Sequence, residues 1–232
     1  MQPRVVSLVP SITETLLAWG IEPAACTRFC EQPGLPHVGG TKDPDVRAIV
    51  DLAPDLVVVD EEENRREDHD ALVDAGIPVH VLGVRDLAHL DEQMVRLADA
   101  VGGRWEPLGA LALAEPPAMR RAYVPIWKRP WMALGEPTYG SAVLRVLGVG
   151  NVAAADGAYP EVDLAGAVAR GADVVIAPSE PYPFAERHRA ELETVAPVVF
   201  VDGRDLLWWG ARTRGALQRL RTQLAGGTTP RP

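Results

Sequence analysis

The chain is 232 residues long, with a hydrophobic fraction of 47%, a charged fraction of 24% and a net charge of −9. These fractions are typical of an ordinary folded protein, and the length allows one large core or two modest ones. The negative charge argues against non-specific binding to nucleic acid or to an anionic membrane, because both need a basic protein surface.

Six short apolar runs, mostly β-branched, predict strands that are buried on both faces, as a parallel sheet requires. They are residues 5–9, 56–59, 79–82, 122–126, 174–177 and 198–201.

Helical patterns lie between these strands. The first, residues 11–19, has the capping box Ser11-x-x-Glu14 and stops at Gly20. The others are residues 44–52, 65–75, 86–101, 108–114 and 186–195. Because strands alternate with helices, the sequence predicts the α/β class with parallel sheets.

The two halves of the chain repeat one another. The aligned segments are residues 53–62 with 172–180, 85–87 with 204–206 and, more weakly, 10–20 with 137–148. Asp55 stands opposite Asp173 in this alignment. The repeat predicts two Rossmann-like lobes. We predict an N-terminal α/β lobe at residues 1–86, a bridging helical segment at 87–117, a C-terminal α/β lobe at 118–225 and a disordered tail at 226–232.

Several segments resemble the solute-binding proteins with a helical backbone, which receive cobalamin, haem or ferric-siderophore complexes for ABC importers. They read RVVSLVPSITE at residues 4–14, GGTKDPD at 39–45, LAPDLV at 52–57, PWMALG at 130–135 followed by Thr138-Tyr139, and GNV at 150–152. The chain is most similar to the cobalamin-binding-like subgroup. This resemblance implies two α/β lobes joined by a helix, with the ligand held between the lobes, usually outside the cytoplasm.

Three features depart from the family pattern. Residues 1–10 show no secretion signal, so the sequence as written predicts a cytoplasmic protein. The bridging segment is short. Where the importers' binding proteins present a glutamate on each lobe to their permease, this chain offers Arg66-Glu67 and then Leu207-Trp208, so the second acid is absent. Whether an ABC permease is a partner is therefore left open. The alternative function is that of a cytoplasmic sensor, carrier or protein-interaction module without a permease partner.

Aromatic side chains gather where the strands of the second half end, and ligands of open α/β lobes lie at the carboxyl ends of strands. Such rings can stack on a flat macrocycle, or they can cap the core of their own lobe. With residues from the first half added, the candidate ligand-binding residues are Phe29, Glu62, Asn64, Trp127, Trp131, Tyr139, Tyr182, Phe184, Trp208 and Trp209.

Two polar features have open interpretations. The acidic stretch at residues 60–64 either contacts ligand amides, a cation or a basic partner, or is a solvated loop before a helix. Cys26 and Cys30 have no second pair at zinc spacing, so we expect packing and no metal site.

The sequence contains no nucleophile elbow, phosphate loop or dinucleotide fingerprint, so we expect no enzyme. We expect a non-catalytic binding protein that requires no cofactor, acts as a monomer and does not insert into a membrane. Its expected ligand is a bulky metal complex, a corrinoid by preference, with haem or another ferric chelate such as a siderophore as alternatives.

Overall fold

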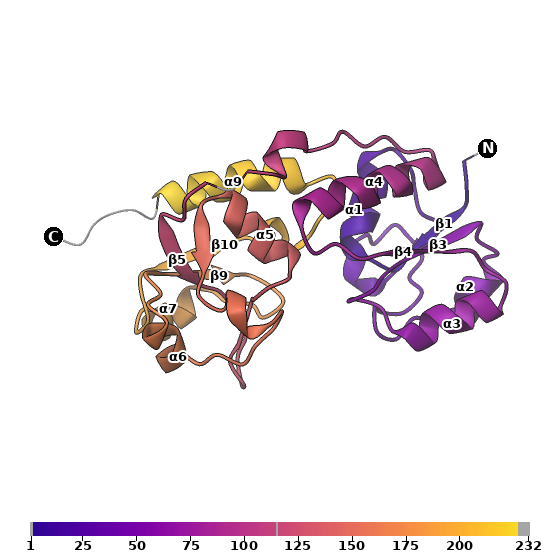
Figure 1. Cartoon of the computed structure of the whole chain (residues 1–232). Coiled ribbons are helices and arrows are strands. Elements are labelled where there is room, and N and C mark those ends of the chain that lie inside the picture. Colours follow the sequence, from indigo (N-terminus) through magenta and orange to yellow (C-terminus); the bar gives the residue numbers. More distant parts are fainter. Residues whose placement is uncertain (1, 115, 227–232) are drawn as a thin grey trace. The chain divides into compact units, whose positions relative to one another are not determined.

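The computed structural model describes residues 2–114 and 116–226, which form two units (Figure 1). The first unit contains the chain up to Val84, together with Leu90–Pro107 and Trp209–Ala211. The second contains Arg85–His89, Leu108–Trp208 and the chain from Arg212 onward. Within the described residues, no helix is both long and apolar enough to cross a membrane.

The first unit has a parallel four-stranded sheet with the order β2-β1-β3-β4. Its strands are β1 (Val5–Ser7), β2 (Ala25–Cys26), β3 (Leu56–Asp60) and β4 (Val79–Leu82). Its helices are α1 (Pro10–Ala18), η1 (Arg28–Cys30), α2 (Val46–Asp51), α3 (Arg66–Asp74) and most of α4 (Leu87–Val101). Val6, Leu8, Val57, Val59 and Leu72 are buried together and form the centre of its core.

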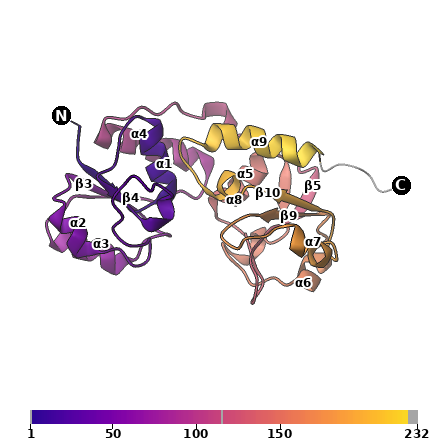
Figure 2. The same cartoon turned by 180° about the vertical axis from the view of Figure 1, so that it is seen from behind.

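The second unit has a parallel four-stranded sheet with the order β10-β9-β5-β8. Its strands are β5 (Arg120–Tyr123), β8 (Val149–Asn151), β9 (Val174–Pro178) and β10 (Val198–Val201), and β6 (Pro125–Trp127) with β7 (Met132–Ala133) adds an antiparallel hairpin. Its helical segments are η2 (Gly109–Leu111), α5 (Tyr139–Val146), η3 (Ala154–Asp156), α6 (Leu164–Ala169), η4 (Glu186–His188), α7 (Arg189–Leu192), α8 (Gly203–Leu207) and α9 (Thr213–Gly226). The helix α9 contacts both α8 and β10 (Figure 2).

The two sheets are built alike, which confirms the predicted fold class and the repeat. The strands β1, β3 and β4 of one sheet occupy the positions of β5, β9 and β10 in the other. Asp55 Oδ2 accepts a hydrogen bond from the backbone N–H of Arg4 at 2.7 Å, and Asp173 Oδ1 accepts one from Arg121 N–H at 3.0 Å. The repeated aspartate therefore ties the start of its strand to the neighbouring strand in both units.

The predicted capping box at the first helix is wrong. The helix α1 begins at Pro10, and its N-cap residue is Val9, which makes no side-chain capping bond. Proline suits the first helical position, so the helix starts before Ser11. Ser11 then lies inside the first turn, where its buried Oγ has no hydrogen-bond partner among the described residues.

Other element limits also differ from the predictions. The expected strand at residues 122–126 is divided between β5 and β6, the expected helix at 108–114 is only the short η2, and the one at 186–195 is divided into η4 and α7. The helix α9 was not predicted, although Ala216, Leu217, Leu220 and Leu224 are buried at helical spacing. The predicted domain limits stay predictions, and the predicted tail lies outside the described residues except for Gly226, which ends α9.

Candidate functional site

Five rings meet beside the sheet of the second unit, and we call them the aromatic cluster. They are Trp127, Trp131, Tyr182, Phe184 and His188. The Trp127 ring meets Tyr182 edge-on, with centroids 5.7 Å apart and an interplanar angle of 78°. The Trp131 ring stacks on Phe184 at 6.0 Å and 7°. The β6–β7 hairpin supplies the tryptophans and the loop after β9 supplies Tyr182 and Phe184, so the cluster follows the carboxyl ends of β5 and β9.

The aromatic cluster has a buried side and an exposed side. Phe184 is 3% exposed and belongs to the core of the second unit, where Trp131 and Tyr182 pack against it. Trp127 is 46% exposed, which is high for so large an apolar side chain. The interior therefore holds one face of the cluster in place while Trp127 presents apolar surface to solvent.

His188 joins the cluster as a neutral ring. Its Nδ1 accepts a hydrogen bond from the backbone N–H of Ala185 at 3.1 Å. Burial lowers the pKa of His188, and the positive charges of Arg187 and Lys128 lower it further. Its packing against Tyr182 and Phe184 gives this histidine a structural role in the cluster.

A lysine lies at the rim of the aromatic cluster. Lys128 Nζ is 5.5 Å from the centroid of the Trp131 ring, within the range of a cation–π interaction. The same ammonium group pairs with the carboxylate of Glu191. The rim therefore carries a positioned cation, which the sequence prediction had missed.

The other predicted aromatic residues lie outside this cluster. Tyr139 and Trp209 are each 5% exposed, and Tyr139 Oη lies 2.9 Å from Thr213 Oγ1. Burial raises the pKa of Tyr139, so the phenol stays protonated. The Trp208 ring lies 5.3 Å from the guanidinium of Arg204 and 5.5 Å from that of Arg212. Ligand contact by these three residues stays a prediction.

In the first unit, the acidic stretch after β3 is a hydrogen-bonded turn. Asp60 Oδ1 accepts hydrogen bonds from the backbone N–H groups of Glu62 at 2.9 Å and Glu63 at 3.0 Å. Asp60 is only 4% exposed, and this burial raises its pKa to about 6. The turn therefore holds a carboxyl group with a raised pKa at the end of β3.

Asn64 fixes the same turn to its neighbours. Its Oδ1 accepts the N–H of Asp60 at 2.8 Å, and its Nδ2 donates to the carbonyl oxygens of Leu8 at 3.2 Å and Thr41 at 2.9 Å. The amide is thus engaged on both its oxygen and its nitrogen, and its main role in the structure is to join three backbone segments. A ligand contact by Asn64 stays a prediction.

Two further predicted residues lie on the surface of the first unit. Glu62 is exposed, and its carbonyl oxygen accepts a hydrogen bond from Lys42 Nζ at 2.6 Å. Phe29 is 50% exposed, with the guanidinium of Arg28 at 4.8 Å from its ring centroid. Both side chains are accessible to a ligand of the first unit.

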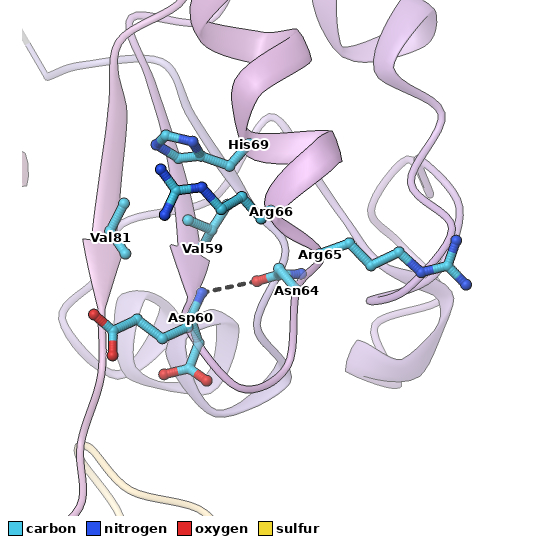
Figure 3. Close-up of a pocket in the computed structure, with 8 residues that line it drawn as sticks. Val59, Asp60, Asn64, Arg65, Arg66, His69 and Val81 are labelled. Atoms are coloured by element: carbon cyan, nitrogen blue, oxygen red, sulfur yellow. Dashed lines mark hydrogen bonds between the residues drawn. The ribbon is translucent and has the colours of Figure 1, made fainter.

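A pocket of about 340 Å³ opens beside the acidic turn, between α3 and the strands β3 and β4 (Figure 3). We call it the α3 pocket. Its lining residues are Val59, Asp60, Glu61, Asn64, Arg65, Arg66, His69 and Val81. Of this set, the sequence analysis named Asn64 as a candidate ligand-binding residue and included Asp60 and Glu61 in the acidic stretch.

The cysteines do not suggest a metal centre. Cys26 and Cys30 are buried, and Cys30 Sγ lies 3.2 Å from the hydroxyl oxygens of Thr13 and Thr27. Burial, helped by the neighbouring Cys30 thiol, raises the pKa of Cys26 to about 12. Across residues 2–114 and 116–226, no group of three or more His, Cys, Asp or Glu side chains could hold a metal ion.

The sequence and the fold are similar to those of known proteins. Residues 5–105 match the family model described as periplasmic binding protein. A periplasmic haem-binding protein, BhuT, in complex with two haems superposes with a TM-score of 0.81, at 21% identity over 98% of this chain and 99% of that one. The fold is that of the periplasmic binding proteins.

Two further structures with the periplasmic-binding-protein fold are similar. The vitamin B12 binding protein BtuF of Vibrio cholerae has a TM-score of 0.77, at 19% identity over 98% of each chain. A periplasmic haem-binding protein from Pseudomonas aeruginosa has a TM-score of 0.78, at 21% identity over 100% of this chain and 96% of that one. No curated protein sequence matches the chain. The matched family consists of binding proteins, in agreement with the expectation of a non-catalytic chain.

Proposed function

We propose that this chain is a non-catalytic binding protein for a bulky metal complex, of the type that delivers ligands to ABC importers. A corrinoid is the preferred ligand, and haem or a ferric siderophore are the alternatives. The periplasmic-binding-protein fold supports the class of protein. The haem and vitamin B12 named for similar structures support the class of ligand.

The aromatic cluster is the observation that carries this proposal. Flat macrocycles bind through large apolar contacts, and an exposed tryptophan ring offers such a contact. The edge contact with Tyr182 holds the Trp127 ring, so little side-chain freedom is lost when a ligand binds. Preorganised aromatic side chains of this kind often dominate binding energy.

The cation at the rim supports the same class of ligand. The phosphate of a corrinoid and the propionates of haem are anionic, and Lys128 lies beside Trp131 within the aromatic cluster. A lysine acts as a point charge toward such groups. Phe29 and Glu62 of the first unit remain candidate contacts, and the place of the ligand with respect to the two units stays a prediction of the sequence.

A thermal-shift panel tests the proposal. The purified chain is melted with cyanocobalamin, haemin and a ferric siderophore, each over a series of concentrations. A ligand present at ~100 times its dissociation constant stabilises the folded state by about 2.7 kcal/mol, so the melting temperature should rise with concentration for at least one of them. If all three leave both the melting temperature and the tryptophan fluorescence unchanged, the proposed ligand class is wrong.

A further inference from the structure

The α3 pocket carries opposite charges at its two ends. Arg66 and His69 lie three residues apart on α3, so they project from one face of the helix. Figure 3 shows both side chains on the α3 side, above Val59 and Val81, with Asp60 at the other end. A pocket with this separation of charge favours a molecule that is itself dipolar.

The end of the pocket at α3 carries a guanidinium and an imidazole ring. His69 Nδ1 lies 2.8 Å from Asp70 Oδ1, which leaves Nε2 as the ring nitrogen for a ligand. The Arg66 side chain is 87% exposed and approaches Asp70 only at 3.8 Å. Its planar guanidinium can therefore turn to hold a carboxylate through two parallel hydrogen bonds.

The acidic end is built into the turn after β3. Asp60 directs Oδ1 to two backbone N–H groups of the turn, which fixes the carboxylate without supplying a cation. Glu61 follows it along the chain and also lines the pocket. Two carboxyl groups at one end provide acceptors for an ammonium group.

The middle of the pocket is apolar. Val59 is 3% exposed and Val81 is 38% exposed, so the second valine presents surface that an aliphatic group can cover. The volume of about 340 Å³ is near the lower end of the ~300–1,000 Å³ that ligand pockets occupy. The space suits a small molecule and not a macrocycle.

We propose that the α3 pocket binds a small zwitterion, namely a free α-amino acid with an aliphatic side chain. The carboxylate pairs with Arg66, the ammonium group faces Asp60 and Glu61, and the side chain covers Val81. An anion alone meets repulsion at the acidic end, and a cation alone meets it at the other end. This site lies in the first unit, shares no residue with the aromatic cluster, and does not rest on the function proposed for that cluster.

The test uses L-leucine and two analogues that each keep one charge, 3-methylbutylamine and 4-methylpentanoate. Binding to the full chain is followed by calorimetry and by amide chemical shifts. Each charge-assisted hydrogen bond changes affinity about tenfold or more, so L-leucine should bind at least ~10-fold more tightly than either analogue. The amide shifts should centre on Asp60, Arg66 and His69.

Matched variants assign the binding to this pocket. Arg66→Gln should weaken L-leucine about tenfold or more while leaving 3-methylbutylamine unchanged, and Glu61→Gln should weaken L-leucine in turn. Arg47→Gln removes the same charge from α2 of the same unit, where Arg47 is exposed and lies outside the pocket lining, so it should bind L-leucine like the native chain. Trp127→Ala should also bind L-leucine normally, because the ring belongs to the other unit.

Three results would overturn the proposal. The first is no heat and no amide shift with L-leucine up to about 10 mM, well above millimolar affinity. The second is binding of 4-methylpentanoate or 3-methylbutylamine as tight as that of L-leucine, which would make the site one for simple ions. The third is an equal loss in Arg47→Gln and Arg66→Gln.

Discussion

Phe184 should be the residue on which the aromatic cluster depends for its stability. The side chain is 3% exposed and touches three rings, at centroid distances of 6.0 Å to Trp131, 4.7 Å to Tyr182 and 5.5 Å to His188. Truncating a buried phenylalanine to alanine typically costs about 3–5 kcal/mol, because the transfer energy is lost and a cavity remains. We therefore expect Phe184→Ala to lower the free energy of unfolding by about 4 kcal/mol.

Trp127→Ala should cost far less, although it removes more atoms. The Trp127 ring is 46% exposed and meets one neighbour, Tyr182, by an edge contact. Such an aromatic pair contributes about 0.5–1.5 kcal/mol. We expect Trp127→Ala to lower the free energy of unfolding by about 1 kcal/mol. The ratio of the two losses in unfolding free energy then shows which ring is buried in the core and which lies at the surface.

Urea unfolding followed by circular dichroism gives both costs, and hydrogen exchange of the β9 amides assigns them to the second unit. Phe184→Leu is the matched control, since it replaces the ring with a large aliphatic side chain and should lose less than about 1.5 kcal/mol. A cost below about 1 kcal/mol for Phe184→Ala, or an equal cost for Trp127→Ala, would refute the division into a buried and an exposed side.

Three further predictions concern single carboxylates. Asp205→Ala should lower the free energy of unfolding by about 3 kcal/mol, because its buried carboxylate pairs with two guanidinium groups at 2.9 and 2.7 Å; an unchanged melting temperature would contradict this. Asp55→Ala and Asp173→Ala should each cost about 1 kcal/mol in urea unfolding, since their bonds to the backbone are equivalent; a severalfold difference would contradict the structural repeat. Because burial raises the folded-state pKa of Asp60 from 3.8 to about 6, the protonated form favours folding, and the stabilising contribution is lost as pH rises through that window. The stability of Asp60→Asn relative to the native chain should therefore rise by up to about 3 kcal/mol over the same window, and a pH-independent difference would be contrary to this.

The arrangement of strands could be predicted because it depends on local pattern. Short β-branched runs such as residues 56–59 and 174–177 are typical of strands buried on both faces of a parallel sheet. The repeat of Asp55 at Asp173 added long-range information, since equivalent residues in a repeat make equivalent contacts. Two parallel sheets built alike follow from these two observations, whereas the strand order and the short strands β2, β7 and β8 were not predicted.

Helix limits were less predictable because several signals compete at each end. At the first helix the capping box at Ser11 competed with Pro10, and the proline determined the start. At α9 the apolar residues have helical spacing, but the charged residues Arg214, Arg219 and Arg221 stand between them, which made the helix hard to recognise. A weak amphipathic pattern of this kind is recognised more easily once its partner surface is known.

The candidate site was predictable by region and residue type but not by the direction of each side chain. Aromatic residues at the strand ends indicated the cluster, and Trp127, Trp131, Tyr182 and Phe184 do meet. Tyr139 looked equivalent in sequence, yet its hydroxyl reaches Thr213, which is distant along the chain. No local signal reports a contact of that range. The burial of Asp60 at the end of β3 was hidden for the same reason.

The central claim is that the exposed side of the aromatic cluster contacts the ligand, and calorimetric titration of Trp127→Ala tests it most directly. The matched control is Tyr159→Ala, because Tyr159 is 45% exposed, belongs to the second unit and lies outside the cluster. For the ligand that stabilises the native chain most, we expect Trp127→Ala to raise the dissociation constant by about 30-fold, the effect of losing a ~2 kcal/mol contact, and Tyr159→Ala to leave it unchanged. Equal dissociation constants for the native chain and Trp127→Ala would contradict the account.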